Sequence, residues 1–265
     1  QIAADGTQMA SVVVLPKHQT QFAISPSGDE LIYVDSAGGN RDLFRRGFSG
    51  GKPVNITESQ ANEGSPNWSP DGTKLLFSSD QDSEKPEIYV MTLDSKQVIR
   101  LTENEFYDSD PCWAPDGTTV LFSRFFPSDD QSKSTGHGAI LEYGLQTQQE
   151  RQLTDLGGYC GGVDYSPDGK KIVFHRVADG TAELWTMDSD GGDQKQITAS
   201  FVDEYSPAWS PDGKWIAYTA GTGNDGQGTF DLWLMRSDGS DQRLITSAAN
   251  TQMSPSWRTG DQFLR

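Results

Sequence analysis

The sequence predicts an all-β protein, a six-bladed β-propeller with four-stranded blades. Two observations predict it: an internal repeat, and the lack of any competing helical periodicity. The repeat places an aromatic residue before a Pro-Asp-Gly turn, as in "SPNWSPDGTKLLFSS" from Ser65, and it returns three times with little change. Weaker copies are "QFAISPSGDELIYVD" from Gln21 and "SPSWRTGDQFLR" from Ser254. Strand-rich repeats of about 40–50 residues are typical of propeller blades.

The aromatic position of the motif defines the period. It falls at Ile24, Trp68, Trp113, Tyr165, Trp209 and Trp257. The spacings between these positions are 44, 45, 52, 44 and 48 residues. Six positions predict six blades.

Each repeat predicts four strands, A to D, in order. Strand A ends at the aromatic residue, and Pro-Asp-Gly then reverses the chain, because Pro presets one dihedral, Asp accepts backbone donors and Gly takes a positive φ. Strand B is an apolar run such as 74–79, and strand C is a run such as 87–93. Strand C ends in hairpin signals, for example Asp190-Gly191. Strand D ends in Leu-Thr or Ile-Thr, at Thr57, Thr102, Thr154, Thr198 and Thr246.

We expect a single domain whose last blade joins the two ends of the chain. The predicted blades are 19–57, 58–102, 103–154, 155–198, 199–246, and 247–265 together with 1–15. Residues 2–15 are similar to a C–D half and residues 253–265 to an A–B half, so joining them would remove an exposed sheet edge. The counterpart of residues 174–185 is missing from this joint. We therefore expect either a short closing blade or a natural chain that extends further.

The charge of the chain excludes two classes of partner. Twenty-one basic and thirty-eight acidic residues give a net charge of −17, whereas nucleic acid and anionic membranes select clustered Lys and Arg. No apolar run reaches the about 18 residues that a membrane helix needs. We expect a monomer that neither binds nucleic acid nor inserts into a membrane. Cys112 and Cys160 fall four positions out of register, about 13 Å apart along a strand, so we expect two free thiols.

The repeats resemble the TolB-type propeller repeat, in which Trp-Ser-Pro-Asp-Gly and a terminal Leu-Thr recur once per blade. The likeness covers essentially the whole chain. It implies a propeller of the TolB-like family that binds a protein segment at the mouth of its tunnel. It also implies a periplasmic or secreted location.

A column five residues before each aromatic position predicts the binding site. It consists of Gln19, Glu63, Asp108, Cys160, Glu204 and Gln252. Each stands where an inner strand enters from the face shared by the D–A and B–C connections, here called the top. Because inner strands converge on one axis, we expect these residues to form a ring. Oxygen ligands suit Ca²⁺ better than Zn²⁺, so Glu63, Asp108 and Glu204, with Asp110 in reserve, are candidate calcium ligands. The alternative is that the carboxylates form an ordinary solvated rim.

Loop lengths also favour the top face as the ligand side. The B–C connections at 124–139 and 220–230 are the longest, and loop elaboration on a regular scaffold is a common way to build a site. We expect a protein or peptide partner, or a small ligand, to be bound by Gln19, Cys160, Gln252, Arg124 and His137.

We interpret the protein as a non-catalytic binding propeller, with two alternatives left open. One is a polysaccharide-active enzyme, a lyase or glycosidase, with a top-face site that includes Arg124, Arg176, Tyr159 and Glu204. The other is a structural or gating propeller of a larger protein, as in peptidases of the prolyl oligopeptidase class. A nucleophile elbow has to join a strand to a helix, which an all-β chain does not offer, and we assign no catalytic residue.

Overall fold

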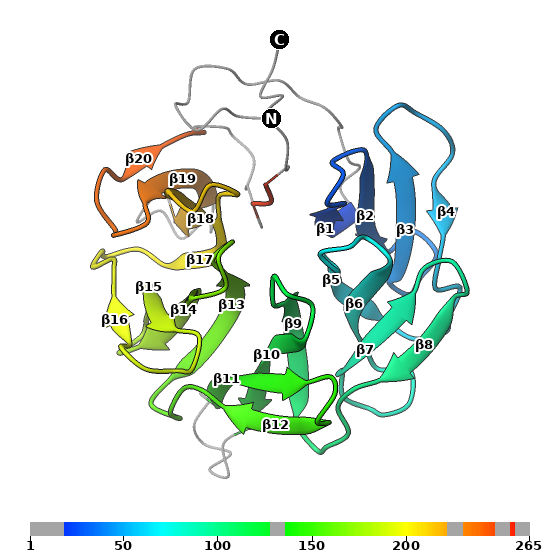
Figure 1. Cartoon of the computed structure of the whole chain (residues 1–265), viewed down its shortest axis with the longest axis horizontal. Coiled ribbons are helices and arrows are strands. Elements are labelled where there is room, and N and C mark those ends of the chain that lie inside the picture. Colours follow the sequence, from blue (N-terminus) through cyan, green and yellow to red (C-terminus); the bar gives the residue numbers. More distant parts are fainter. Residues whose placement is uncertain (1–18, 128–135, 222–229, 247–254, 258–265) are drawn as a thin grey trace.

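The computed structural model describes residues 19–127, 136–221, 230–246 and 255–257. Within these ranges the chain forms twenty strands and no helix. The strands make five antiparallel four-stranded sheets, and the sheets stand as blades around one axis (Figure 1). The prediction of an all-β propeller with four-stranded blades is confirmed.

The first three blades follow one another along the chain. The first contains β1 (Gln19–Ile24), β2 (Glu30–Asp35), β3 (Asp42–Gly47) and β4 (Val54–Asn55). The second contains β5 (Glu63–Trp68), β6 (Lys74–Ser79), β7 (Glu87–Thr92) and β8 (Gln97–Arg100). The third contains β9 (Tyr107–Trp113), β10 (Thr119–Phe126), β11 (His137–Gly144) and β12 (Gln149–Gln152).

The last two described blades repeat the same order. The fourth contains β13 (Tyr159–Tyr165), β14 (Lys171–Ala178), β15 (Thr181–Asp188) and β16 (Lys195–Gln196). The fifth contains β17 (Glu204–Trp209), β18 (Trp215–Gly221), β19 (Phe230–Arg236) and β20 (Arg243–Leu244). In every blade the first strand lies nearest the axis and the fourth lies outermost (Figure 1).

The apolar core lies between neighbouring blades. Four clusters of buried side chains occupy the four interfaces between described blades, for example Ile32, Trp68 and Phe77 between the first and second. A single sheet has two faces to cover, so stacking sheets face to face buries what one blade could not bury alone. The aromatic column supplies a large part of this contact.

The terminal Thr of each repeat clamps strand C. Its hydroxyl oxygen accepts a hydrogen bond from a strand-C backbone N–H at 2.9–3.0 Å in all five described blades. In four blades the same hydroxyl donates to a carboxylate at the start of strand C, as Thr102 donates to Glu87 at 2.5 Å. The recurrent Leu-Thr therefore joins the two outer strands of each blade.

The Pro-Asp-Gly turns have a mechanical role on the bottom face. The Asp71 carboxylate accepts hydrogen bonds from the Ser69 hydroxyl at 2.6 Å and the Thr73 backbone N–H at 3.0 Å. Gly72 has a φ of 71°, and a Cβ built on it would lie 3.8 Å from Pro26 in the preceding blade. The turn thus reverses the chain and packs against its neighbour.

The prediction of six blades, with the ring closed by N- and C-terminal strands, is wrong. The described residues form five blades, and their arc is open between β17–β20 and β1–β4 (Figure 1). Trp257 lies outside any strand, yet its Nε1 donates to the Ala208 carbonyl at 2.9 Å, as Trp68 Nε1 donates to Ala23 at 3.2 Å. A Trp at this position of the repeat therefore indicates a contact with the preceding blade, and a single residue can make that contact without a strand around it. A blade requires four paired strands.

Candidate functional site

The carboxylates predicted to ring the axis are buried in separate crossovers between blades. Glu63 has no exposed surface, and it accepts hydrogen bonds from the hydroxyls of Ser59 at 2.6 Å and Ser79 at 3.2 Å. Burial raises its pKa, and the surrounding hydroxyls partly oppose that shift. Its contacts join the end of the first blade to the second.

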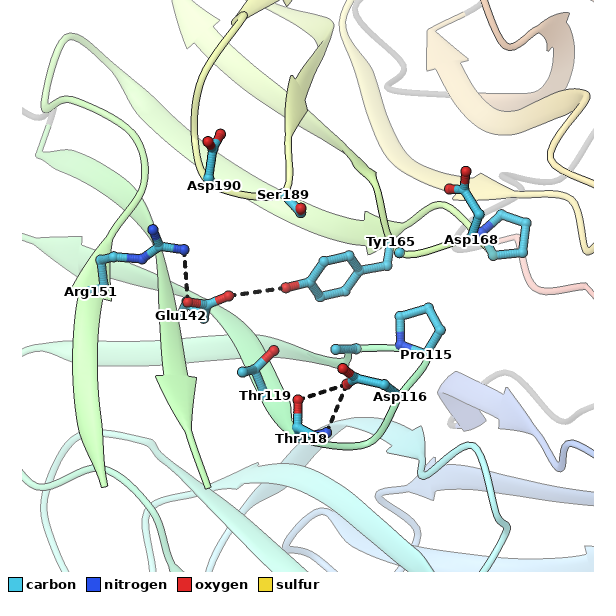
Figure 2. Close-up of a pocket in the computed structure, with 13 residues that line it drawn as sticks. Pro115, Asp116, Thr118, Thr119, Glu142, Arg151, Tyr165, Asp168, Ser189 and Asp190 are labelled. Carbon is cyan, nitrogen blue, oxygen red and sulfur yellow. Dashed lines mark hydrogen bonds and ion pairs between the residues drawn. The ribbon is translucent and has the colours of Figure 1, made fainter. Parts of the chain in front are cut away.

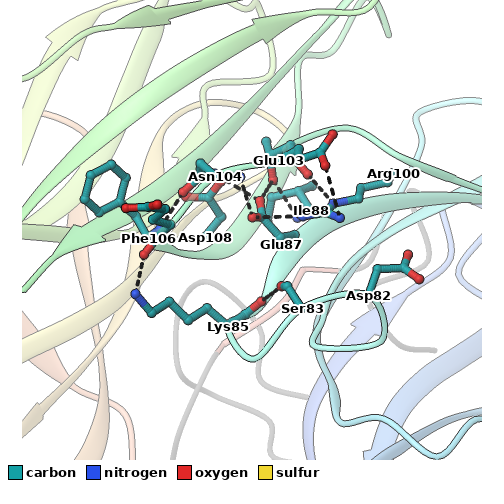
Figure 3. A network of polar contacts seen from close by, with 12 residues as sticks. Asp82, Ser83, Lys85, Glu87, Ile88, Arg100, Glu103, Asn104, Phe106 and Asp108 are labelled. Carbon is teal, nitrogen blue, oxygen red and sulfur yellow. Dashed lines mark hydrogen bonds and ion pairs between the residues drawn. The ribbon is translucent and has the colours of Figure 1, made fainter.

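Asp108 belongs to a larger polar network (Figure 3). Arg124 donates to both of its carboxylate oxygens, at 2.7 and 2.8 Å, and also to Glu150 across the same sheet. Asn104 donates from one amide nitrogen to Asp108 at 2.9 Å and to the buried Glu87 at 3.0 Å. Arg124, predicted as a ligand-binding residue, is therefore a buried link between the first and last strands of its blade.

Glu204 and Cys160 occupy the equivalent positions of the last two blades. Burial raises the pKa of Glu204 to about 7, while the hydroxyls of Thr198 and Ser200 hold it lower than burial alone would. Its Oε2 atom accepts no hydrogen bond from the described residues. Cys160 is a buried free thiol whose pKa is raised by burial. Cys112 is the other buried free thiol.

The remaining predicted residues are dispersed. His137 is exposed at the start of β11, and Asp110 lies within β9, where its carboxylate accepts a hydrogen bond from the Ser65 hydroxyl at 2.9 Å. Gln252 lies outside the described residues, and of Gln19 only the backbone is described. Among the described residues no three His, Cys, Asp or Glu side chains come together as metal ligands. Calcium binding therefore stays a prediction.

A ring of β-bulges lines the inner strands. Each inner strand has one residue with positive φ, three positions before the aromatic column: Gln21, Ser65, Asp110, Gly162 and Ser206. The register of each first strand shifts at this residue or beside it. Bulges also connect blades, because Gln21 Oε1 accepts a hydrogen bond from the Ser65 backbone N–H at 3.0 Å. Such bulges turn side chains away from the regular alternation of a strand.

A continuous series of aromatic rings crosses the top of the third, fourth and fifth blades. We call it the aromatic belt, and it consists of Tyr107, Phe125, Tyr159, His175, Tyr205 and Phe230. Successive ring centroids lie 6.2, 6.1, 5.7, 5.0 and 5.8 Å apart, all within the range of favourable aromatic pairs. At one end the Lys85 ammonium lies 5.5 Å from the centre of the Tyr107 ring.

The fourth blade is altered to hold the middle of the belt. The place of His175 is taken by Ser78 and Ser123 in the second and third blades. A Cβ on Gly162 would lie only 2.8 Å from His175 Nδ1, and one on Gly161 would lie 3.0 Å from both the imidazole and the Tyr159 hydroxyl. Two glycines therefore make room for the imidazole. Burial lowers the pKa of His175 to about 4, so the ring is neutral at physiological pH.

Exposed apolar side chains occur in the belt and in two crossovers that enter blades from the top. Tyr107 is 41% exposed, and Phe201 and Leu156, in the crossovers that enter the fifth and fourth blades, are also exposed. Apolar side chains gathered on one face, with rings at a fixed spacing, are typical of a binding surface.

Two residues of the belt are direct sequence neighbours of residues that the sequence pattern predicted to bind a ligand. Tyr107 and Tyr159 stand directly before Asp108 and Cys160, two members of the predicted column. Strand alternation places consecutive residues on opposite sides, so the column marked the buried side and its neighbours form the belt. The aromatic residues before the column and the unusual Gly161-Gly162 pair were the available signals.

Comparison with known proteins agrees with this geometry. Five four-stranded sheets about an axis, with an aromatic surface on top, define a β-propeller suited to binding. The model of the TolB beta propeller domain matches residues 2–131 and 132–264, and the chain belongs to this family. Over 197 residues the chain is 32% identical to the Tol-Pal system protein TolB of Francisella tularensis subsp. mediasiatica, covering 73% of this chain and 43% of that protein.

Two further proteins resemble the chain, one in sequence and one in structure. The chain is 26% identical over 212 residues to the uncharacterized peptidase YuxL of Bacillus subtilis, covering 74% of this chain and 28% of that protein. The structure of a putative TolB from Agrobacterium tumefaciens superposes with a TM-score of 0.80 at 23% identity, covering 97% of this chain and 91% of that one. The chain spans less than half the length of the two curated relatives, TolB of Francisella tularensis at 43% and YuxL at 28%. No described residue belongs to a helix that could cross a membrane.

Proposed function

We propose that this propeller is a non-catalytic binding module that captures a protein segment on the aromatic belt. The belt is the observation that carries the proposal: six successive rings across three blades, with Tyr107 exposed at one end and an exposed Phe201 in the crossover that enters the fifth blade. An extended peptide can stack its side chains on such a row and hydrogen-bond through its backbone. Aromatic anchors commonly dominate the energy of such interfaces.

Family membership supports a binding role over catalysis. A propeller is a scaffold for many functions, and the buried acids of this one are committed to crossovers between blades. Resemblance to TolB-type proteins supports a location in the periplasm or outside the cell as part of this proposal. Sugar rings also stack on aromatic platforms, so polysaccharide binding or turnover is the competing outcome of the test.

Peptide display separates these possibilities. Peptides selected on the wild-type propeller should bind at least about tenfold more weakly to a Tyr107→Ser/Phe201→Ser variant, because anchor residues typically contribute about 2 kcal/mol or more. The control is Val98→Ser/Ile99→Ser, which removes two exposed apolar side chains from the outer strand β8. Equal affinity for both variants would contradict the proposal, as would release of reducing sugar from a polysaccharide panel.

A further inference from the structure

We propose that a cavity on the bottom face, between the third and fourth blades, binds an aliphatic polyamine. The cavity measures about 530 Å³ and is shown in Figure 2. Small-molecule sites are commonly about 300–1,000 Å³. It is formed by the A–B turns of both blades and by the C–D turn of the fourth at Ser189 and Asp190. This is the face opposite the aromatic belt, so the inference does not depend on the function proposed for the belt.

The cavity lies where the repeat changes. At the other three interfaces between described blades the aromatic position is Trp68, Trp113 or Trp209, and here it is Tyr165. A phenol ring fills less space than an indole. The facing residue of the preceding blade differs at each described interface: it is Glu142 here, and Arg45, Val90 and Thr186 at the others.

Tyr165 and Glu142 both line the cavity and are hydrogen-bonded to each other. The Tyr165 hydroxyl donates to Glu142 Oε1 at 3.4 Å, and Arg151 donates to Glu142 Oε2 at 2.9 Å. Glu142 is thereby fixed on the cavity wall with both oxygens oriented. Among the four described interfaces, only this one replaces the Trp of the repeat by Tyr, and the replacement sets a hydroxyl beside a carboxylate in the cavity.

The charge of the lining selects a cation. Four carboxylates line the cavity: Asp116, Glu142, Asp168 and Asp190. Arg151 pairs with Glu142 at 2.9 Å and Lys170 pairs with Asp168 at 3.5 Å, so Asp116 and Asp190 are the two that form no ion pair with the described residues. Asp116 and Asp190 each use only Oδ1 to accept hydrogen bonds from their own turns. Ionised carboxylates are acceptors only, so the ligand has to supply donors.

The arrangement of these groups favours a chain of charges over a single ion. No three acidic, His or Cys residues among the described ones are placed to hold a metal. Figure 2 shows the labelled carboxylates on different sides of the Tyr165 ring, with Pro115 beside it. A polyamine places ammonium groups at intervals along an alkyl chain, so its ends can meet separate carboxylates while its methylenes cover Tyr165 and Pro115.

The test is titration calorimetry of the full chain with spermidine at about 150 mM salt, where diffuse surface attraction is screened. Tyr165→Trp restores the residue of the other blades and fills the cavity. It should weaken spermidine binding at least tenfold. Asp190→Asn should weaken it about 2- to 5-fold, as expected for one partly exposed ion pair. The control Asp238→Asn changes the equivalent turn of the fifth blade, whose Asp238 also caps its own turn, and should leave binding unchanged.

Two results would overturn the proposal. One is spermidine binding that does not saturate, or that is as tight in Tyr165→Trp as in the wild type, since both indicate general attraction to an acidic surface. The other is an equal effect of Asp190→Asn and Asp238→Asn. This pair of surface variants decides the matter even if Tyr165→Trp fails to fold, which a circular dichroism melt will show.

Discussion

The second and fourth blades share one strand order and one register, but they use the same positions differently. In the second blade the bulge residue is Ser65, and Ser78 on the next strand pairs with Gly64 directly before it. In the fourth blade Gly162 takes the bulge and His175 fills the space that a side chain would occupy. The residue before the aromatic position is Asn67 in one and Asp164 in the other, and both accept the next blade's backbone N–H, from Trp113 at 3.2 Å and from Trp209 at 2.7 Å.

Side chains of the repeat can therefore differ in size and charge between blades at positions where the change does not affect strand pairing. The second blade satisfies its inner strand with small polar side chains. The fourth blade instead buries an imidazole, whose Nδ1 has no hydrogen-bond partner among the described residues, and a carboxyl whose pKa burial raises to about 7. When burial shifts the pKa of a group by disfavouring its charged form, the free energy of unfolding falls at every pH where the unfolded chain would carry that charge. Proteins accept such a cost mainly where a site needs it.

Gly162→Ala should have the largest effect on the fourth blade. The residue has a φ of 57°, and the new Cβ would lie 2.8 Å from His175 Nδ1 and 3.3 Å from the Ser206 backbone. Backbone strain together with overpacking should lower the free energy of unfolding by about 2–4 kcal/mol. Urea denaturation of the two proteins measures the difference.

A double mutant shows whether His175 is the cause. Gly162→Ala combined with His175→Ser gives the fourth blade the small residue found at Ser78 in the second. The pair should be coupled by about 1–2 kcal/mol, so that the double mutant is more stable than the sum of the single changes predicts. Simple additivity would mean that the backbone conformation alone requires glycine.

Asp164→Asn should remove a pH dependence of stability that the fourth blade has and the second blade, with Asn67 at the same position, lacks. The folded protein keeps the Asp164 proton up to about pH 7, whereas the unfolded chain releases it near pH 4. Unfolding therefore becomes more favourable as pH rises from about 4 to 7. The variant should be more stable than the wild type by about 1–3 kcal/mol at pH 8, which is less than full burial would give because Asp164 is partly exposed. This gain should vanish near pH 4.

The reciprocal change in the second blade provides the control. Asn67→Asp introduces a carboxyl at the position that accepts the Trp113 backbone N–H, and it should create the same loss of stability above neutral pH. Thermal melts of both variants from pH 4 to pH 8 measure the two slopes. A pH-independent gain from Asp164→Asn would show that the carboxyl is ionised in the folded protein and that its burial is unimportant.

Much of the fold could be predicted because the repeated residues form turns and hydrogen bonds with residues close to them in sequence. The Pro-Asp-Gly turn and the terminal Thr act within one blade or on the adjacent one, so a single copy of the sequence contains the reason for each. The number of blades could not be predicted in the same way. Trp257 contacts the preceding blade as the other members of its column do, but it belongs to no strand. The sequence pattern does not distinguish such a contact from a complete blade.

The site was predicted less well because side-chain direction on the inner strands depends on the bulges. The repeat spacing correctly predicted that Glu63, Asp108 and Glu204 occupy equivalent positions. Each carboxylate, however, is buried in its own crossover between blades and does not face the axis together with the others. The belt depends on contacts between residues from different blades, such as His175 with Tyr205 at 5.0 Å. Their distance in sequence hides this contact until the sheets are stacked.

Tyr165→Phe should have the smallest effect, and Trp68→Phe in the second blade is its matched partner. The lost hydroxyl makes one long hydrogen bond to Glu142, at 3.4 Å, and Glu142 keeps its contact with Arg151. The expected loss is at most about 1 kcal/mol. Trp68→Phe removes the 3.2 Å bond to Ala23 and also part of a buried indole, so its loss should be about 1–3 kcal/mol. Urea denaturation orders the two variants. If Tyr165→Phe costs more than Trp68→Phe, the third and fourth blades depend on that hydroxyl, and their interface is not the loosely filled one that could accommodate a cavity.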